Sequence, residues 1–193
     1  MNEFNEDTFL KEEFNRVIND NRIRSVIETG TYLGYTASFF AQISSVHLVV
    51  TIDISKRWID MDNRAEFLLG DSRVEVTKAL SMVKEKNAFP LLIYLDAHPD
   101  CIDKPVGPLA DELKAIASFF SGNPGIALPW IAIHDCVVPG RDFGFDTYSD
   151  GPISWDTHKA GIEAIYPNGC DVTYNNEASG AYRGCMFVSP HIA

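Results

Sequence analysis

Residues 28–36 read Glu28-Thr29-Gly30-Thr31-Tyr32-Leu33-Gly34-Tyr35-Thr36. They follow a short β-branched run at residues 24–28 (RSVIE) and lead into a helical pattern over residues 33–43. Gly30 can turn the backbone with a positive φ, and Gly34 lets a helix begin close to a ligand or a strand. The G-x-x-x-G spacing differs from the G-x-G-x-x-G of dinucleotide sites, and no P-loop lysine follows. Such a turn after the first strand of an open α/β sheet predicts a ligand site.

On both sides of this turn the chain alternates short strands with helices. Strands are expected at residues 24–28, 47–53, 65–69, 90–96, 130–135, 171–174 and 183–188. Helices are expected at residues 6–19, 33–43, 74–86, 110–120 and 155–165. The alternation is typical of an α/β fold with a mostly parallel sheet and helices on both faces. A length of 193 residues suits a single domain over residues 1–193, with an N-terminal helix inside residues 1–22.

Composition and charge exclude several classes of function. Lysine and arginine total 16 against 27 acidic residues, which gives a net charge of −11. Such a charge repels phosphate backbones, so nucleic acid is not expected as a partner. The sequence has no apolar run long enough to span a bilayer and no export signal, so we expect a cytoplasmic protein. The four cysteines form no C-x-x-C pair and are expected to be reduced.

Acidic residues follow the next two strands. Asp53 ends the second strand, where a carboxylate can accept hydrogen bonds from vicinal ribose hydroxyls, and Asp71-Ser72 follow the third strand. In order, E-T-G-x-x-x-G, an acid ending strand two, G-D-S and the L-D ending strand four resemble the class I S-adenosylmethionine-dependent methyltransferases. The resemblance covers nearly the whole chain from residue 24 and implies a Rossmann-like fold with a seven-stranded sheet.

The same resemblance implies S-adenosylmethionine as the cofactor and assigns its contacts. The methionine part would lie among the residues of the glycine turn, with Glu28 beside it. Asp53 would hold the ribose, and Asp71 and Ser72 the adenine side. The implied cofactor-binding residues are Glu28, Gly30, Tyr32, Gly34, Thr36, Asp53, Asp71, Ser72 and Asp96.

Simpler roles stay open for some of these residues. Gly30 and Gly34 could serve only the turn and the packing of the helix, and Asp71 could cap the helix that follows it. The connection between the second and third strands is short, so the helix usual in this fold is expected to be reduced or missing there. The adenine contacts depend most on that region.

The fourth and fifth strands end in a second group of polar residues. Asp96 and His98 follow the fourth strand, and His134 and Asp135 follow the fifth. Because neighbouring parallel strands lie about 4.8 Å apart, these side chains are expected to meet at one edge of the sheet. Carboxylates suit Mg²⁺ or Mn²⁺, and imidazoles admit Fe²⁺ or Zn²⁺.

This arrangement resembles the metal-dependent sugar O-methyltransferases of the macrocin type. Carried over by position, Asp96, His134 and Asp135 would be metal ligands for Mg²⁺ or Mn²⁺. His98 would be the general base, and Asp96 and His98 together the catalytic residues. Histidine replaces the usual aspartate at 98 and 134, so the resemblance supports a bound metal less strongly than it supports the cofactor.

The loop after the fifth strand is rich in glycine and aromatic residues, and in it Arg141 and Tyr148 are expected to contact a small-molecule substrate. The resulting prediction is methylation of a hydroxyl on a small polar compound such as a sugar. One alternative is a cofactor-binding module without catalytic activity. Another is a metal-dependent hydrolase, because Asp96-Ala97-His98-Pro99-Asp100 also resembles the D-A-H-x-D motif of arginase-like ureohydrolases. A second subunit could complete the acceptor pocket in an oligomer.

Overall fold

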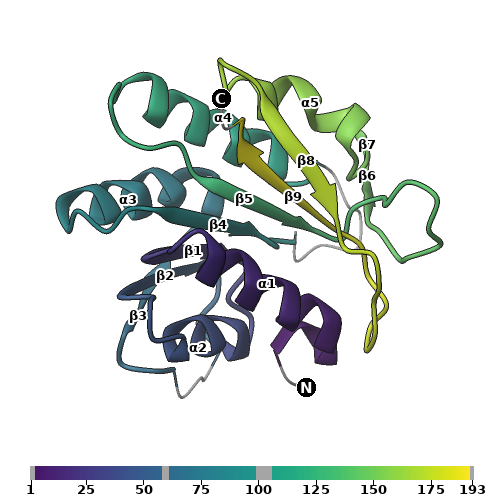
Figure 1. Cartoon of the computed structure of the whole chain (residues 1–193), viewed down its shortest axis with the longest axis horizontal. Coiled ribbons are helices and arrows are strands. Elements are labelled where there is room, and N and C mark those ends of the chain that lie inside the picture. Colours follow the sequence, from purple (N-terminus) through teal and green to yellow (C-terminus); the bar gives the residue numbers. More distant parts are fainter. Residues whose placement is uncertain (1–2, 58–60, 99–105, 192–193) are drawn as a thin grey trace.

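The computed structural model describes residues 3–57, 61–98 and 106–191. Seven strands form one sheet in the order β3-β2-β1-β4-β5-β9-β8, as Figure 1 shows. Their bounds are β1 Ser25–Thr29, β2 Leu48–Asp53, β3 Ala65–Leu69, β4 Leu91–Leu95, β5 Trp130–His134, β8 Cys170–Tyr174 and β9 Cys185–Pro190. The predicted seven-stranded sheet is confirmed.

The strand order creates the place where a ligand can bind. Strands β1 to β5 pair in parallel, whereas β9 runs antiparallel to both β5 and β8. The chain winds from β1 outward to β3, and then returns to the other side of β1 with β4. Open sheets bind ligands at this reversal, beyond the carboxyl ends of the strands. Here those ends belong to β1, β2 and β4.

Helices cover both faces of the sheet, as predicted. Helices α1 (Thr8–Asp20) and α2 (Tyr35–Gln42) lie on one face, and α3 (Ser72–Glu85), α4 (Leu109–Ser121) and α5 (Trp155–Glu163) lie on the other (Figure 1). Successive residues of one strand therefore enter different cores. Val26 packs in the core under α1 and α2, and Ile27 packs in the core under α3, α4 and α5. Every residue of β1 is buried, because both of its faces are covered.

Several element ends differ from expectation by a few residues, for local reasons. Helix α1 begins at Thr8 because the Asp7 side chain accepts a hydrogen bond from the Leu10 N–H at 3.0 Å and caps the helix. Strand β5 ends at His134, because Asp135 takes a positive φ of 55°. The short pair β6 (Thr147–Tyr148) and β7 (Gly151–Pro152) was not predicted, since two-residue strands have no periodic signal.

The other structural expectations concern connections and cysteines. Among the described residues between β2 and β3, at 54–57 and 61–64, no helix forms, which confirms the reduced connection. Cys136, Cys170 and Cys185 are free thiols, and Cys101 lies outside the described residues. Within the described ranges, no helix has the length and apolar character needed to cross a membrane.

Candidate functional site

The glycine turn after β1 is shaped by contacts that only glycine permits. Gly30 has a φ of 86°, and a Cβ added there would lie 2.3 Å from the backbone oxygen of Asp96. Gly34 has a φ of 77° and stands immediately before α2, as its N-cap. The turn therefore presses against the end of β4, and both glycines have the structural role left open by the sequence.

The end of β2 holds this turn in place. The Asp53 carboxylate accepts hydrogen bonds from the Tyr32 N–H at 2.9 Å and from the Ser55 N–H at 2.9 Å. Behind it, the Thr51 hydroxyl donates to Glu28, which is 1% exposed. Burial raises the pKa of Glu28 to about 8, against the opposing effect of that hydrogen bond. Glu28 thus lies in the core of β1, behind the turn.

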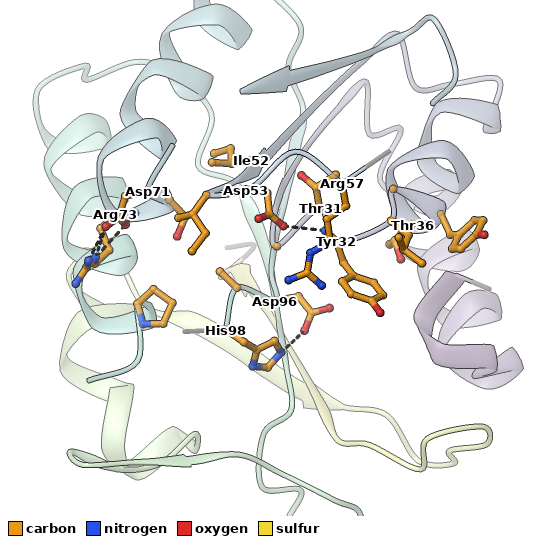
Figure 2. Close-up of a pocket in the computed structure, with 18 of the residues that line it drawn as sticks. Thr31, Tyr32, Thr36, Ile52, Asp53, Arg57, Asp71, Arg73, Asp96 and His98 are labelled. Atoms are coloured by element: carbon orange, nitrogen blue, oxygen red, sulfur yellow. Dashed lines mark hydrogen bonds and ion pairs between the residues drawn. The ribbon is translucent and has the colours of Figure 1, made fainter. Parts of the chain in front are cut away.

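A pocket of about 630 Å³ opens above these strand ends, and we call it the strand-end pocket (Figure 2). Figure 2 shows Tyr32 and Thr36 at one side, Asp71 and Arg73 at the other, and Asp96 and His98 along its base. Its lining includes these expected cofactor residues: Gly30, Tyr32, Gly34, Thr36, Asp53, Asp71, Ser72 and Asp96. Glu28 is not part of the lining. A volume of this size is within the range of small-molecule sites.

Asp71 has the second role that the sequence left open. Its side chain accepts from the Arg73 N–H at 3.0 Å and caps α3. It also pairs with the Arg73 guanidinium, at 2.5 Å between Nη2 and Oδ2. That hydrogen bond keeps the pKa of Asp71 below its ordinary value. Asp71 is thus a helix cap at the rim of the strand-end pocket, with its charge already paired.

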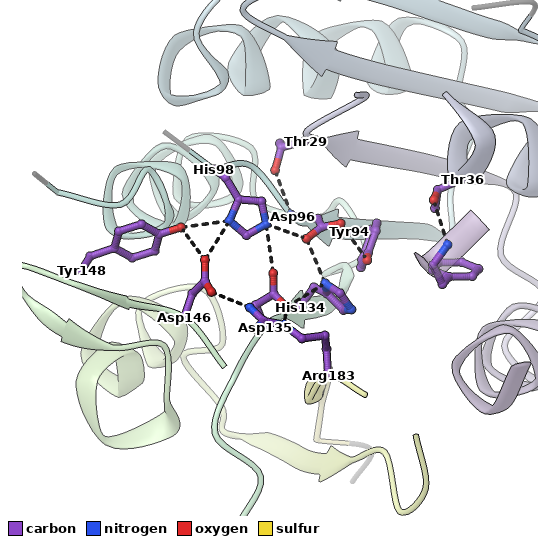
Figure 3. Close-up of polar contacts among 11 residues, drawn as sticks. Thr29, Thr36, Tyr94, Asp96, His98, His134, Asp135, Asp146, Tyr148 and Arg183 are labelled. Atoms are coloured by element: carbon purple, nitrogen blue, oxygen red, sulfur yellow. Dashed lines mark hydrogen bonds and ion pairs between the residues drawn. The ribbon is translucent and has the colours of Figure 1, made fainter. Parts of the chain in front are cut away.

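The polar side chains at the ends of β4 and β5 meet as expected. The His98 Nε2 lies 3.2 Å from Asp96 Oδ1 and 3.0 Å from Asp135 Oδ2. The His134 Nδ1 lies 3.0 Å from Asp96 Oδ1 and 3.4 Å from Asp135 Oδ1. Together with Asp146, which contacts His98 Nδ1 at 3.2 Å, they form what we call the acid–histidine cluster (Figure 3).

Three residues at this site were not found from the sequence: Tyr94, Asp146 and Arg183. The Arg183 guanidinium pairs with Asp135 through Nε and with Asp146 through Nη2 (Figure 3). The Tyr94 hydroxyl donates to Asp96 Oδ2 at 3.1 Å. Asp146 and Arg183 come from the loop after β5 and the turn before β9, so no local motif joins them to Asp96.

The charges of the acid–histidine cluster shift its pKa values strongly. Burial disfavours a charged imidazole, but hydrogen bonds to Asp135 and Asp96 outweigh it and raise the pKa of His98 to about 12. At His134 the charges of Asp96 and Asp135 likewise outweigh the effect of burial, and the pKa of His134 rises to about 10. The neighbouring cations hold the pKa of Asp135 well below its usual range despite burial. Both histidines therefore carry a proton at neutral pH.

The cluster has the ligand types of a divalent-metal site. Ligand atoms of Asp96, His134 and Asp135 lie within 4.8 Å of one another, and those of His98, Asp135 and Asp146 do as well. However, each of the six carboxylate oxygens of Asp96, Asp135 and Asp146 already contacts an N–H or O–H group. The two His98 nitrogens both face carboxylates. In this arrangement the residues do not fit a metal ion, because both His98 nitrogens carry a proton and have no lone pair to donate, and the three carboxylates are already paired with His98, His134 and Arg183.

Glu112, in the first turn of α4, is a buried acid. It is 1% exposed, and its Oε1 has no hydrogen-bond partner among the described residues. Burial raises the pKa of Glu112 to about 7, although hydrogen bonds with Ser72 and Thr29 oppose the shift. Thr29 in turn accepts from the Asp96 N–H at 3.3 Å. Glu112 thus connects Ser72 of the strand-end pocket with the residue that holds Asp96.

The buried Glu112 predicts a pH-dependent change in stability. Its folded-state pKa of about 7 exceeds the ordinary 4.5, so the folded state keeps the proton to a higher pH. Stability is therefore lost as the pH rises through this window, and at about 1.4 kcal/mol per unit the loss is roughly 3 kcal/mol. Glu112→Gln should remove that loss. The variant should therefore gain stability over the wild type, and the gain should be larger at pH 8 than at pH 5. Urea unfolding at both pH values measures this gain, and Glu85→Gln, at an exposed position, is the control. If the difference in free energy of unfolding between Glu112→Gln and the wild type does not grow with pH, the raised pKa of Glu112 is contradicted.

The two expected substrate residues lie in different environments. Arg141 is exposed and does not line the strand-end pocket. Tyr148 is buried behind His98, with its hydroxyl 3.0 Å from His98 Nδ1. A cavity of about 10 Å³, lined partly by Tyr148, Glu112 and His98, lies beside it. Asp100, the last acid of the D-A-H-x-D motif, lies outside the described residues.

No protein-family model matches this sequence, and no curated protein does either. Solved structures do match. Human methyltransferase-like protein 13 in complex with S-adenosylhomocysteine has a TM-score of 0.55 at 13% identity, over 94% of this chain and 82% of that one. A Staphylococcus aureus protein described as a caffeoyl-CoA O-methyltransferase has a TM-score of 0.52 at 16% identity, over 94% and 83%.

Spermidine synthase in complex with the transition-state analogue AdoDATO has a TM-score of 0.56 at 15% identity, over 97% of this chain and 62% of that one. The chain spans 61%, 33% and 31% of the length of three further matches, two of them structures of the MycE methyltransferase. Because spermidine synthase shares the fold, the fold alone does not select the reaction. The topology and the matches to methyltransferase-like protein 13 and the Staphylococcus aureus protein agree on one conclusion: the chain has the Rossmann-like fold of the class I S-adenosylmethionine-dependent methyltransferases.

Proposed function

We propose that this chain binds S-adenosylmethionine in the strand-end pocket and transfers its methyl group to a hydroxyl of a small polar compound, such as a sugar. The observation that carries the proposal is the position of one pocket between the glycine turn, Asp53 and the acid–histidine cluster. The turn supplies close backbone approach, and Asp53 supplies a carboxylate beside it. Asp96 and His98 line the same pocket, so a bound acceptor could reach both them and the cofactor.

Three features of the strand-end pocket support binding of the cofactor. The missing side chain at Gly30 lets the turn pack against the backbone of Asp96, and Gly34 starts α2 at the edge of the same pocket. The Asp53 carboxylate reaches the pocket from the end of β2, where it can accept hydrogen bonds from ribose hydroxyls. Ile54, which is exposed, and Ser72, which is buried, also line the pocket, and we assign them to the adenine side.

Methyl transfer needs an aligned acceptor and a destination for its proton. S-adenosylmethionine supplies an electrophilic methyl group on a sulfonium, and most of the rate gain comes from positioning. The pKa of His98 near 12 means that its imidazole already carries a proton. We therefore assign the acceptor's proton to the Asp96–His98 pair rather than to the imidazole alone. Asp96 receives the proton, and the His98 imidazolium orients the carboxylate through the 3.2 Å contact.

Calorimetric titration with S-adenosylmethionine and S-adenosylhomocysteine tests the proposal. Both compounds should bind, and Asp53→Asn should weaken binding by roughly 10- to 100-fold, because hydrogen bonds to a charged group contribute about 1.5–3 kcal/mol. Asp171→Asn is the matched control, since this half-exposed acid lies on the edge strand β8. Binding of neither compound to the folded protein would refute the proposed cofactor.

An acceptor screen separates methyl transfer from its alternative. Methyl-labelled cofactor and a panel of hydroxylated compounds should yield a labelled product with the wild-type protein. Cofactor binding without transfer to any acceptor would favour the module without catalytic activity.

A further inference from the structure

We infer that Arg183 takes the place of a divalent cation in the acid–histidine cluster, so that this cluster works without a metal ion. The inference bears on methyl transfer only if the proposed function holds, but its central claim concerns cation binding and can be tested alone. It is carried by the position of one guanidinium that contacts one oxygen of each of two neighbouring carboxylates, Asp135 and Asp146.

The guanidinium bridges two acids that come from different segments. Its Nε contacts Asp135, at the end of β5, and its Nη2 lies 2.5 Å from Asp146 Oδ1 (Figure 3). The Asp135 side chain is 7% exposed and that of Arg183 is 27% exposed, so the pair is largely shielded from water. Arginine cannot lose its proton in a protein, and it satisfies carboxylates with two parallel or divergent N–H groups. The positive charge at this point is therefore permanent.

The backbone around Arg183 fixes that position. Gly184 N–H donates to the Gly144 oxygen at 3.0 Å, and Gly144 N–H donates to the Tyr182 oxygen at 2.8 Å. A Cβ at Gly184 would lie 2.0 Å from the Cys136 oxygen, so this turn packs directly against the segment after β5. The Asp146 N–H donates to the Asp135 oxygen at 2.8 Å and keeps the two acids together. These backbone contacts therefore hold Asp135, Asp146 and Arg183 in fixed positions relative to one another.

Each of the four carboxylate oxygens of Asp135 and Asp146 already contacts a nitrogen of Arg183 or His98. Asp135 Oδ1 contacts Arg183 and Oδ2 contacts His98, while Asp146 Oδ1 contacts Arg183 and Oδ2 contacts both His98 and Tyr148. A divalent ion at Asp135 would lie beside a like charge that cannot be removed by deprotonation. Binding would require Arg183 to leave both carboxylates. Removing the guanidinium should therefore create a metal site where the wild type has none.

The test is a titration of the cofactor-free protein with Mn²⁺, in which the electron paramagnetic resonance signal measures the concentration of free Mn²⁺. The wild-type signal should match the buffer at every concentration. Arg183→Gln, a neutral side chain of similar reach, should bind Mn²⁺ and lower the signal of free Mn²⁺ below that of the buffer. Arg16→Gln, which alters an exposed arginine of α1, is the matched control and should behave like the wild type. Circular dichroism establishes that the variants are folded.

Stoichiometric Mn²⁺ binding by the wild type, lost in Asp135→Asn, would overturn the inference without any variant of Arg183. A folded Arg183→Gln protein that still binds no Mn²⁺ would overturn the assignment to this guanidinium. Titration of the same samples with S-adenosylhomocysteine keeps the two proposals distinct. If the wild type binds S-adenosylhomocysteine with the same affinity in the presence of Mn²⁺ and of EDTA, the result supports both the proposed cofactor and the inference about Arg183. A wild type that binds neither Mn²⁺ nor S-adenosylhomocysteine supports the inference and contradicts the proposed function.

Discussion

Gly30→Ala is expected to abolish S-adenosylhomocysteine binding and to lower the free energy of unfolding by at least about 2 kcal/mol. Two separate costs combine at this position. A φ of 86° is unfavourable for any residue with a Cβ, and the new Cβ would lie 2.3 Å from the backbone oxygen of Asp96. The end of β4 or the glycine turn must move to relieve that contact. Either movement displaces residues on two sides of the strand-end pocket.

A matched glycine separates the two costs. Gly140 also has a positive φ, 75°, but a Cβ added there meets no atom within 4 Å. Gly140→Ala should therefore show only the backbone cost and keep the wild-type affinity for S-adenosylhomocysteine. Urea unfolding and calorimetric titration measure both variants. Wild-type affinity in Gly30→Ala would contradict the role of this close approach.

The sheet and the pocket wall were predictable because their signals are local. Buried parallel strands appear as short apolar runs, and each one expected from the sequence is present within a few residues. The glycine turn could be placed because Gly30 directly follows the first strand. Once the strand order is known, the carboxyl ends of β1, β2 and β4 must meet, which places Asp53 and Asp96 at one pocket.

The cation of the acid–histidine cluster could not be predicted, because its contacts are long-range. Arg183 lies 48 residues after Asp135 and 37 after Asp146 in the sequence. The charge it provides decides between a metal site and a closed ion-pair network, and no spacing encodes that contact. The sequence supported a metal from the residue types and from the resemblance to macrocin-type methyltransferases, whereas the contacts of Asp135 and Asp146 favour Arg183 as their cation.

Glu112 shows how packing overrides a local expectation. An acid in the first turn of a helix usually lies in solvent and interacts with the helix dipole. In α4 this turn instead packs against α3 and the end of β1, so the Glu112 carboxyl is buried beside Ser72 and Thr29. The helix was placed correctly, but its rotation relative to the sheet depends on the neighbouring elements. That rotation brings a titratable group next to the strand-end pocket.

His98→Gln is expected to lower methyl transfer by roughly 10²- to 10⁴-fold, the usual contribution of a positioned proton-transfer group. The glutamine amide can retain a contact with one carboxylate, but it cannot supply the positive charge that pairs with Asp96 and Asp135. With that charge gone, Asp96 is no longer oriented as the proton acceptor. Affinity for S-adenosylhomocysteine should change far less, because His98 lies at the base of the strand-end pocket and not at the glycine turn.

Transfer of labelled methyl groups to an acceptor found in the screen measures the effect of His98→Gln. His191→Gln is the matched control, since this exposed histidine pairs with Asp171 at 2.9 Å, away from the strand-end pocket. If His98 acts through its charge and Asp96, then Asp96→Asn should cause a loss of similar size, and the double variant should lose little more. Residues that act as one unit are non-additive in this way. Full activity in His98→Gln, or two losses that simply multiply, would show that the pair does not share the proton.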